Sequence, residues 1–223
     1  MTRLTARFIA SVLTTALLLA PVSLAFDTPL SDQAVREAYF LGQRHDGTFA
    51  RLLEKYTRFL PPPKTGPYIS SIAFHTPFIQ LVHFSDRFVG NYSAQQAAIE
   101  HRKHGDEIVQ IFVEIQLTAS YGEFLAPPAN SRSNLPSSLI PRPQDFWRDF
   151  QARIYDGDKE LTPTGNHGHA NYSCGDNGPC ILTGATLEFD FPADAFTSDS
   201  AAIDVVPPEG AEVSIAFDLS SLR

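Results

Sequence analysis

The chain has 223 residues, of which 43% are hydrophobic, and carries a formal net charge of −8 at pH 7. This length and apolar content are typical of one domain of ordinary size, alone or with a small appendage, that buries a sizeable core. An acidic chain has no electrostatic reason to bind nucleic acid or an anionic membrane, so we exclude nucleic acid as a partner.

The first 25 residues have the pattern of a secretory signal peptide. Arg3 and Arg7 form a short basic region, residues 8–20 are largely apolar, and small side chains precede an expected cleavage after Ala25. Cleavage would remove two arginines and no acid, which changes the formal charge from −8 to −10. An uncleaved anchor is the alternative, but the apolar run is short for a bilayer. We therefore expect an exported protein, periplasmic or extracellular, without a membrane span in the mature chain.

Residues 26–63 predict an N-terminal helical hairpin. Ser31 is suited to cap the first helix, and Asp32 to lie at its positive end. Apolar residues at three- and four-residue spacing indicate the second helix, which the prolines at 61–63 end. These apolar residues are Phe49, Leu52, Leu53, Tyr56 and Leu60. We expect the hairpin to pack on, or lie beside, a β domain at residues 64–223.

Two aromatic and β-branched segments, at residues 68–74 and 78–84, predict strands at the start of the β domain. Pro77 between them indicates a kink, a bulge or an edge position. One short inserted helix follows, because Ser93 and Gln96 have the spacing of a capping box.

The clearest strand is predicted at residues 107–118. Hydrophobic residues at 109, 111, 113, 115 and 117 alternate with polar ones, which places one face on a core and the other near water. Residues 119–145 are rich in proline and serine and have no sustained period, so they predict a long surface loop.

Further alternating segments predict short strands separated by turns. They cover residues 146–155, 159–163, 185–191, 201–206 and 212–219. Asp156 and Gly157 are a strong hairpin signal between the first two. The protein is therefore predicted to be mainly β, with an antiparallel β-sandwich of immunoglobulin-like type; a jelly roll or an open barrel is the alternative.

Cys174 and Cys180 are the only cysteines, and in an exported chain they predict a local disulfide. Redox catalysis is the alternative, although the spacing is not C-x-x-C. Such a disulfide would fix one loop rather than hold the whole fold together.

His167 and His169 form an H-x-H pair that could bind zinc or copper from an extended segment. The alternative is a pair of polar loop histidines that are hydrogen-bonded or in water. Two ligands do not complete a site, so a third would have to come from elsewhere in the fold. The candidates are His75, His83, His101 and His104.

Four aromatic residues could form an exposed platform for a carbohydrate or a partner strand. They are Trp147, Tyr155, Tyr121 and Phe124, with core packing as the alternative. A carboxylate pair for glycoside hydrolysis could also be assembled from Glu114, Asp149 or Glu188.

No segment carries a specific catalytic or cofactor motif, so the sequence assigns no cofactor and favours a non-enzymatic role. The leading hypothesis is a binding or structural module of the cell envelope, with a protein or glycan partner. A metal-binding protein or metalloenzyme centred on His167 and His169 is the first alternative. A carbohydrate-active module is the second.

Overall fold

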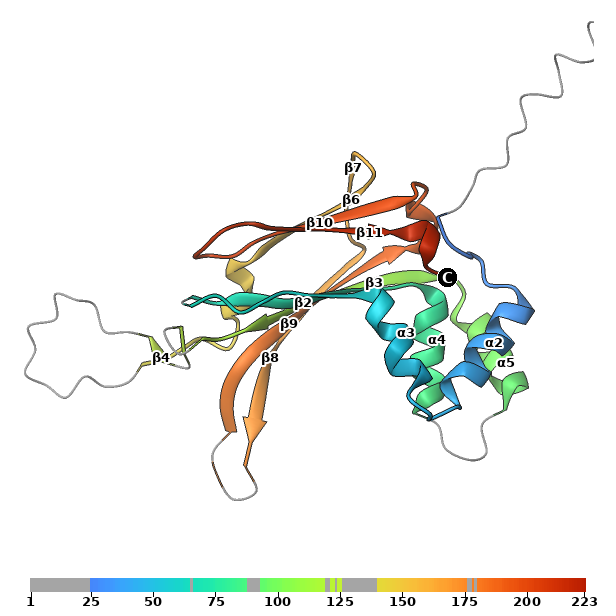
Figure 1. Cartoon of the computed structure of the whole chain (residues 1–223), viewed down its shortest axis with the longest axis horizontal. Coiled ribbons are helices and arrows are strands. Elements are labelled where there is room, and N and C mark those ends of the chain that lie inside the picture. The colour runs from blue at the N-terminus through green and yellow to red at the C-terminus, as the bar shows by residue number, and fades with distance from the viewer. Residues whose placement is uncertain are drawn as a thin grey trace, which may run out of the picture.

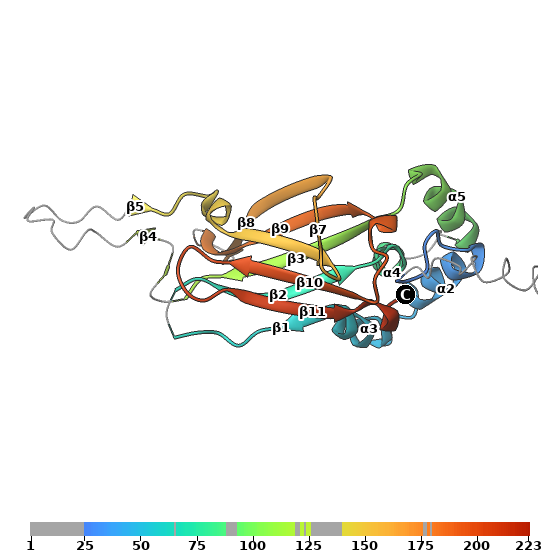
Figure 2. The same cartoon turned by 90° about the horizontal axis from the view of Figure 1, so that it is seen from above.

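The structure is a computed structural model whose described residues form two antiparallel sheets that lie face to face and four α-helices that gather at one end (Figures 1 and 2). The predicted signal peptide and most of the predicted loop at 119–145 lie outside the described residues. The described residues are 25–64, 66–87, 93–118, 121–122, 124–125, 140–175, 178 and 180–223.

The larger sheet has five strands in the order β1–β2–β3–β9–β8. Its strands are β1 (Thr57–Phe59), β2 (Tyr68–His75), β3 (Ile108–Gln116), β9 (Cys180–Pro192) and β8 (Gly165–Cys174). The predicted central strand is confirmed as β3, and its alternation is seen directly in the burial of its side chains. Val109, Ile111, Val113 and Ile115 are fully buried, whereas the residues between them are only partly buried.

The smaller sheet has four strands in the order β11–β10–β6–β7. Its strands are β11 (Val213–Asp218), β10 (Ser200–Val206), β6 (Gln151–Asp156) and β7 (Lys159–Leu161). The predicted hairpin at Asp156 and Gly157 is confirmed, because β6 turns there into β7 and Gly157 adopts a φ of 56°. That left-handed conformation favours glycine. A separate two-stranded ladder joins β4 (Phe124–Leu125) and β5 (Ile140–Pro141).

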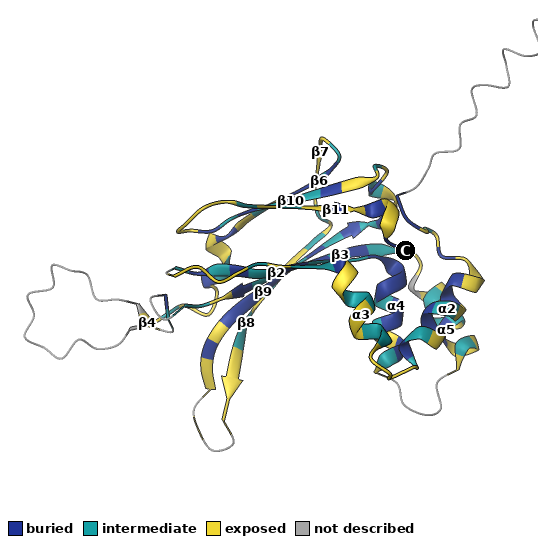
Figure 3. Ribbon diagram, viewed as in Figure 1, coloured by how far each residue is buried: buried dark blue, intermediate teal, exposed yellow. Residues whose placement is uncertain are grey.

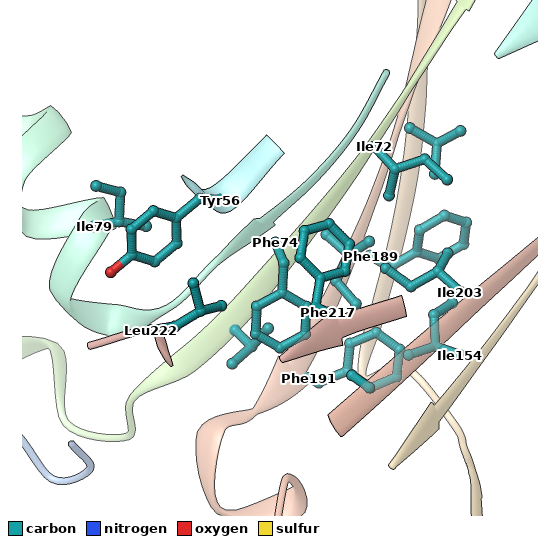
Figure 4. Packing of buried hydrophobic residues seen from close by; sticks show 14 of the residues in the cluster. Tyr56, Ile72, Phe74, Ile79, Ile154, Phe189, Phe191, Ile203, Phe217 and Leu222 are labelled. Carbon is teal, nitrogen blue, oxygen red and sulfur yellow. The ribbon is translucent and has the colours of Figure 1, made fainter. Parts of the chain in front are cut away.

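The core lies between the two sheets and is rich in phenylalanine (Figures 3 and 4). Phe74 of β2 faces Phe217 of β11 with ring centroids 5.6 Å apart. Phe196 lies between Phe74 and Phe191, at 5.1 and 5.8 Å from their rings. Complete burial of one such side chain stabilises the fold by roughly 1.5–3 kcal/mol, so this cluster stabilises the packing of the two sheets.

The helices lie at one end of the five-stranded sheet, on the side away from the smaller sheet, with α3 and α4 nearest its strands (Figure 1). They are α2 (Asp32–Gly42), α3 (Thr48–Tyr56), α4 (Pro77–Asp86) and α5 (Ala94–His104). The predicted caps are present: Ser31 accepts the backbone N–H of Ala34, and Ser93 and Gln96 form a capping box. No helix among these is long and apolar enough to cross a membrane.

The first helix packs mainly on α4 and α5 rather than on α3. At the α2–α4 crossing a Cβ on Gly42 would lie 2.4 Å from the carbonyl oxygen of Val82. The helices of the predicted hairpin at 26–63 therefore exist, but the hairpin is not confirmed as a unit. The boundary between it and the β domain at 64–223 stays a prediction.

The strand predicted at residues 78–84 is wrong, because these residues form α4. Thr76 caps this helix, with its hydroxyl accepting the N–H of Ile79, and Pro77 occupies the first turn. Proline suits that position because its missing N–H would have no partner in the helix. Apolar side chains on several sides of α4 are buried between the sheet and the other helices, so the segment lacks the polar face that marks a surface helix.

Two predicted boundaries are also corrected. The second helix ends at Tyr56 rather than near Leu60, and the next three residues pair with β2 as β1. Residues 146–149 form a short 3₁₀ helix, η1 (Phe146–Asp149), before β6 begins. Similar short turns are η2 (Ala193–Ala195) and η3 (Leu219–Ser221).

Candidate functional site

The five-stranded sheet has a polar outer face, which is the face turned away from the core. Gln110, Phe112 and Glu114 of β3 lie on it because they alternate with the buried residues. The strand register places Glu188 of β9 directly beside Phe112, and Thr186 beside Glu114. Neighbouring residues in a ladder share one face of the sheet, so β3 and β9 present one continuous polar surface.

A cavity of about 880 Å³ lies between this outer face and the helices α4 and α5. Figure 1 shows these helices against one end of the face, with β8 and β9 curving toward the same side at the other end. Apolar and polar side chains both line the cavity. They include Ala73, His75, Leu81, His83, Phe84, Ala97, His101, Glu107, Gln110, Phe112 and Glu114.

His75 is the last residue of β2 and lies in the wall of this cavity. Its ring centroid is 4.9 Å from that of Phe112. Burial, with the nearby His83 as a smaller cause, lowers the pKa of His75 to about 4. The imidazole is therefore neutral at pH 7 and has one donor and one acceptor nitrogen. Neither nitrogen has a hydrogen bond to another described residue, so both are available to a molecule in the cavity.

His83 lies on α4 and borders the same cavity. Its Nε2 is 3.2 Å from a guanidinium nitrogen of Arg87, and its ring is 5.6 Å from that of Phe49. Burial, and then the charge of Arg87, lower the pKa of His83. The positive charge at this end of the cavity therefore belongs to Arg87.

Glu107 stabilises the part of the cavity wall that is formed by α5 and the start of β3. Its carboxylate accepts hydrogen bonds from the backbone N–H of Leu30 at 2.6 Å and from the Thr28 hydroxyl at 2.7 Å, and it pairs with His101 Nε2 at 3.0 Å. Burial raises the pKa of Glu107, but these partners together outweigh burial and hold the pKa below its usual value. The contacts join the N-terminal segment, α5 and the start of β3.

Two hydrogen-bonded groups of side chains extend the polar outer face from Gln110 and Glu114, which line the cavity, onto β9 and β8. The Gln110 amide donates to Glu188 Oε1 at 2.7 Å and to Asp190 Oδ1 at 3.2 Å. Glu114 accepts from the Thr186 hydroxyl at 2.9 Å and from the Asn171 amide at 3.3 Å. In the described part of the chain, no ion pair with lysine or arginine involves any of these three carboxylates.

The structure places His167 and His169 on the outer face of β8, beside Glu188 and Thr186 of β9. It places neither His75 nor His83 next to them. Two strands lie between β2 and β8, which corresponds to roughly 14 Å at the usual strand spacing. Among the residues described, no three His, Cys, Asp or Glu side chains are grouped closely enough to hold a metal ion. The side chain of His104 is outside the described part.

The four aromatic residues predicted as a platform are held in different environments. Trp147 packs on β8 where a Cβ at Gly168 would lie 2.5 Å from its ring. Tyr121 is buried, with the Arg142 guanidinium carbon 3.5 Å from its ring centroid. Tyr155 alternates with buried Ile154 and lies on the outer side of the smaller sheet. Phe124 lies on β4 and is 40% exposed.

Two of the three candidate carboxylates come together. Glu114 and Glu188 lie on one face of neighbouring strands and are diagonal neighbours in the ladder. Asp149 lies apart from them, in η1. The predicted disulfide is confirmed: Cys174 and Cys180 are bonded and join the ends of β8 and β9.

The sequence analysis does not predict the cavity, because α4 forms one wall of the cavity and the residues of α4 are predicted from the sequence to be a strand. The signal that could have found this helix is the pair Thr76 and Pro77, a cap followed by proline in the first turn. A search of protein-family models and of curated proteins finds no match to the chain. The chemistry of the cavity is therefore the basis for inferring a function.

Proposed function

We propose that this protein is an exported, non-enzymatic binding module of the cell envelope that holds a small organic molecule in the cavity beneath α4 and α5. The observation that carries the proposal is the cavity itself, about 880 Å³ in volume, with the imidazole of His75 in its wall, which has no hydrogen bond to another described residue. Pockets for small molecules are usually about 300–1,000 Å³, mostly apolar, with a few polar groups that orient the ligand.

The walls of the cavity supply both apolar and polar surface. Leu81 and Phe84 of α4 and Phe112 of β3 provide apolar area, and His75 provides a donor and an acceptor. An amphipathic organic molecule would bury its apolar part against the first three and direct a polar group toward the imidazole.

The cavity is held in shape without a ligand. The amide of Gln80 on α4 donates to the backbone carbonyls of His75 and Ile108, at 3.0 and 2.8 Å, which ties the helix to β2 and β3. Glu107 ties α5 to the same sheet. A preformed site costs less ordering entropy on binding, which favours a binding function.

Export is supported by the signal-like pattern of the first 25 residues and by the Cys174–Cys180 disulfide, since disulfides persist in oxidising compartments. In this proposal the two sheets act as an immunoglobulin-like scaffold that supports the cavity, and residues 26–63 act as a helical hairpin beside it. The mature protein would be periplasmic or extracellular.

The proposal is tested with a neutral apolar fluorophore, N-phenylnaphthylamine, and with a variant that fills the cavity. Ala73→Phe places a ring in the cavity from β2, whereas Ala202→Phe makes the same change on the outer side of β10 in the other sheet. We expect Ala73→Phe to weaken binding of the fluorophore by about tenfold or more, equivalent to about 1.4 kcal/mol, and Ala202→Phe to leave it unchanged. Equal affinity in all three proteins, each with a native circular-dichroism spectrum, would refute the proposal.

A carbohydrate-active module is the second candidate, favoured by the diagonal placement of Glu114 and Glu188 next to the cavity. The backbones of such a pair are roughly 7–8 Å apart, so the glutamate side chains can reach the separation of roughly 5–9.5 Å between carboxyl groups that glycosidases use. A screen of reducing-sugar release from envelope glycans, with Glu188→Gln as the inactive control, tests this candidate. No release by the wild-type protein would remove it.

A further inference from the structure

We infer that the ligand of the cavity is an organic cation, a molecule with an apolar body and an ammonium or guanidinium group. This inference rests on the proposed function, because it names the class of molecule that the same cavity selects. Two independent features support it: the shape and lining of the cavity, and the charge of the sheet surface onto which it continues.

The apolar half of the ligand is specified by the part of the cavity between α4 and the sheet. Leu81 and Phe84 of α4 lie opposite Ala73 and Phe112 of the sheet. A ring or a short alkyl chain between these walls would leave water and gain dispersion contacts. The neutral imidazole of His75 adds no positive charge, so a cation beside it is not repelled, and its acceptor nitrogen can receive an N–H.

The charged half of the ligand is specified by acids that lie along β3 and β9 beside the cavity. Glu114 itself lines the cavity. Glu188 lies beside Phe112, and Asp190 lies beside Gln110, one ladder step closer to His75. The carboxylates of Glu188 and Asp190 are roughly 6 Å apart at most, because both lie within hydrogen-bond reach of the same Gln110 nitrogen.

Among the described residues these acids have no arginine or lysine partner, and the cross-strand neighbour of Glu188 on β8 is a histidine, His167. Their hydrogen-bond donors are the neutral groups of Gln110, Thr186 and Asn171, and no described arginine or lysine forms an ion pair with them. Neutral donors orient a carboxylate but do not cancel its charge. A ligand ammonium placed over the ring of Phe112 would meet Glu114 and Glu188 on either side and the aromatic face below.

Other ligand classes fit less well. An anionic molecule could meet the guanidinium of Arg87, which also lines the cavity, but it would have to approach these acids on a chain whose net charge is already −8. A bare divalent metal ion would need three or more ligands together, and the described residues hold no such group. A neutral apolar molecule would contact only the apolar part of the cavity between α4 and the sheet.

The experiment compares three molecules that share a phenyl ring and a short chain and differ in charge: phenethylamine, phenethyl alcohol and hydrocinnamate. Each is titrated into the purified full protein by calorimetry at pH 7 and low salt, and each is also tested for displacement of N-phenylnaphthylamine. We expect the amine to bind at least about tenfold more tightly than the alcohol, and the carboxylate to bind most weakly. The advantage of the amine should shrink as salt is added.

Charge-removing variants locate the source of the preference. Glu188→Gln together with Asp190→Asn keeps similar shapes but removes two charges, and should reduce the affinity for the amine at least about tenfold while leaving the alcohol and the fluorophore unchanged. Asp158→Asn, at the exposed turn between β6 and β7, removes a charge far from the site and should change nothing.

The outcomes separate the two proposals. Fluorophore binding that Ala73→Phe abolishes, combined with equal affinities for amine and alcohol, would overturn the cation inference and leave the binding function standing. An amine preference that survives Glu188→Gln/Asp190→Asn would overturn it as well. If neither the three phenyl compounds nor the fluorophore binds, both proposals are overturned; if only the fluorophore binds, the cation inference alone is overturned.

Discussion

The imidazole of His75 lies against the ring of Phe112, with ring centroids 4.9 Å apart and the planes tilted by 58°. The contact joins the end of β2 to the middle of β3 and forms one continuous wall of the cavity. The contact also keeps the titratable imidazole of His75 partly out of water, so the free energy of unfolding depends on pH.

The first prediction concerns that sensitivity. The unfolded chain protonates His75 near pH 6.5, whereas the folded protein does so only near pH 4. Above pH 6.5 both states are neutral and His75 has no effect on stability. As the pH falls from 6.5 to 4, the unfolded state binds the proton first, so the free energy of unfolding decreases, by roughly 3 kcal/mol at most.

Urea denaturation at pH 7 and pH 4.5 measures this effect. His75→Gln should lose less stability between the two pH values than the wild-type protein, because it removes the group that titrates. His167→Gln, an exposed position on β8, serves as the control and should behave as wild type. Identical losses in His75→Gln and wild type would contradict the neutral, buried state of His75.

The second prediction concerns the carboxylate of Glu107, which holds the wall of the cavity. Glu107→Gln should lower the free energy of unfolding at pH 7 by about 2 kcal/mol, because charge-assisted hydrogen bonds from Thr28, Leu30 and His101 are weakened. The pKa of Glu107 is lowered in the folded state, so its contribution is present above its unfolded pKa and is lost as the pH falls through the folded value. The difference between wild type and variant should therefore shrink in acid.

Glu160→Gln on β7 is the matched control, since that side chain is exposed. It should leave the denaturation midpoint within experimental error. A Glu107→Gln protein as stable as this control at pH 7 would show that the cluster around Glu107 does not hold the wall.

The third prediction tests how α2 docks. Gly42→Ala should destabilise the protein by roughly 1–3 kcal/mol, because the new methyl group would overlap the Val82 carbonyl and force α2 away from α4. Gly175→Ala is the control, because a Cβ there meets nothing within 4 Å. If thermal denaturation gave both variants the same midpoint, the close α2–α4 contact would be wrong.

The fourth prediction concerns the histidine pair on β8. His167→Ala/His169→Ala should bind N-phenylnaphthylamine as wild type does, and the zinc and copper content of wild type, purified without chelators, should stay well below one ion per chain. Elemental analysis measures the metal. Near-stoichiometric metal that disappears in the double variant would instead support the metalloprotein hypothesis.

Local patterns in the sequence predict much of the β structure. The alternation in β3 has a direct physical cause, since one face must be apolar to reach the core and the other need not be. The hairpin at Gly157 and the capping box at Ser93 are equally local, because each depends on a few neighbouring residues. These elements are confirmed.

The cavity could not be predicted in this way. Residues 78–84 are apolar on several sides because α4 is enclosed by the sheet and other helices, and such a run has no period that separates a buried helix from a strand. The site also depends on strand register, which brings Glu188 beside Phe112 although they are 76 positions apart in the chain. No local pattern encodes that pairing.

The most direct test of the binding function is a nuclear magnetic resonance titration of the protein with N-phenylnaphthylamine. We expect the side-chain resonances of His75 and Phe112 to shift and saturate together, while those of Tyr155, on the outer side of the other sheet, stay fixed. Resonances of His75 and Phe112 that do not move at saturating fluorophore would show that the cavity is not a binding site.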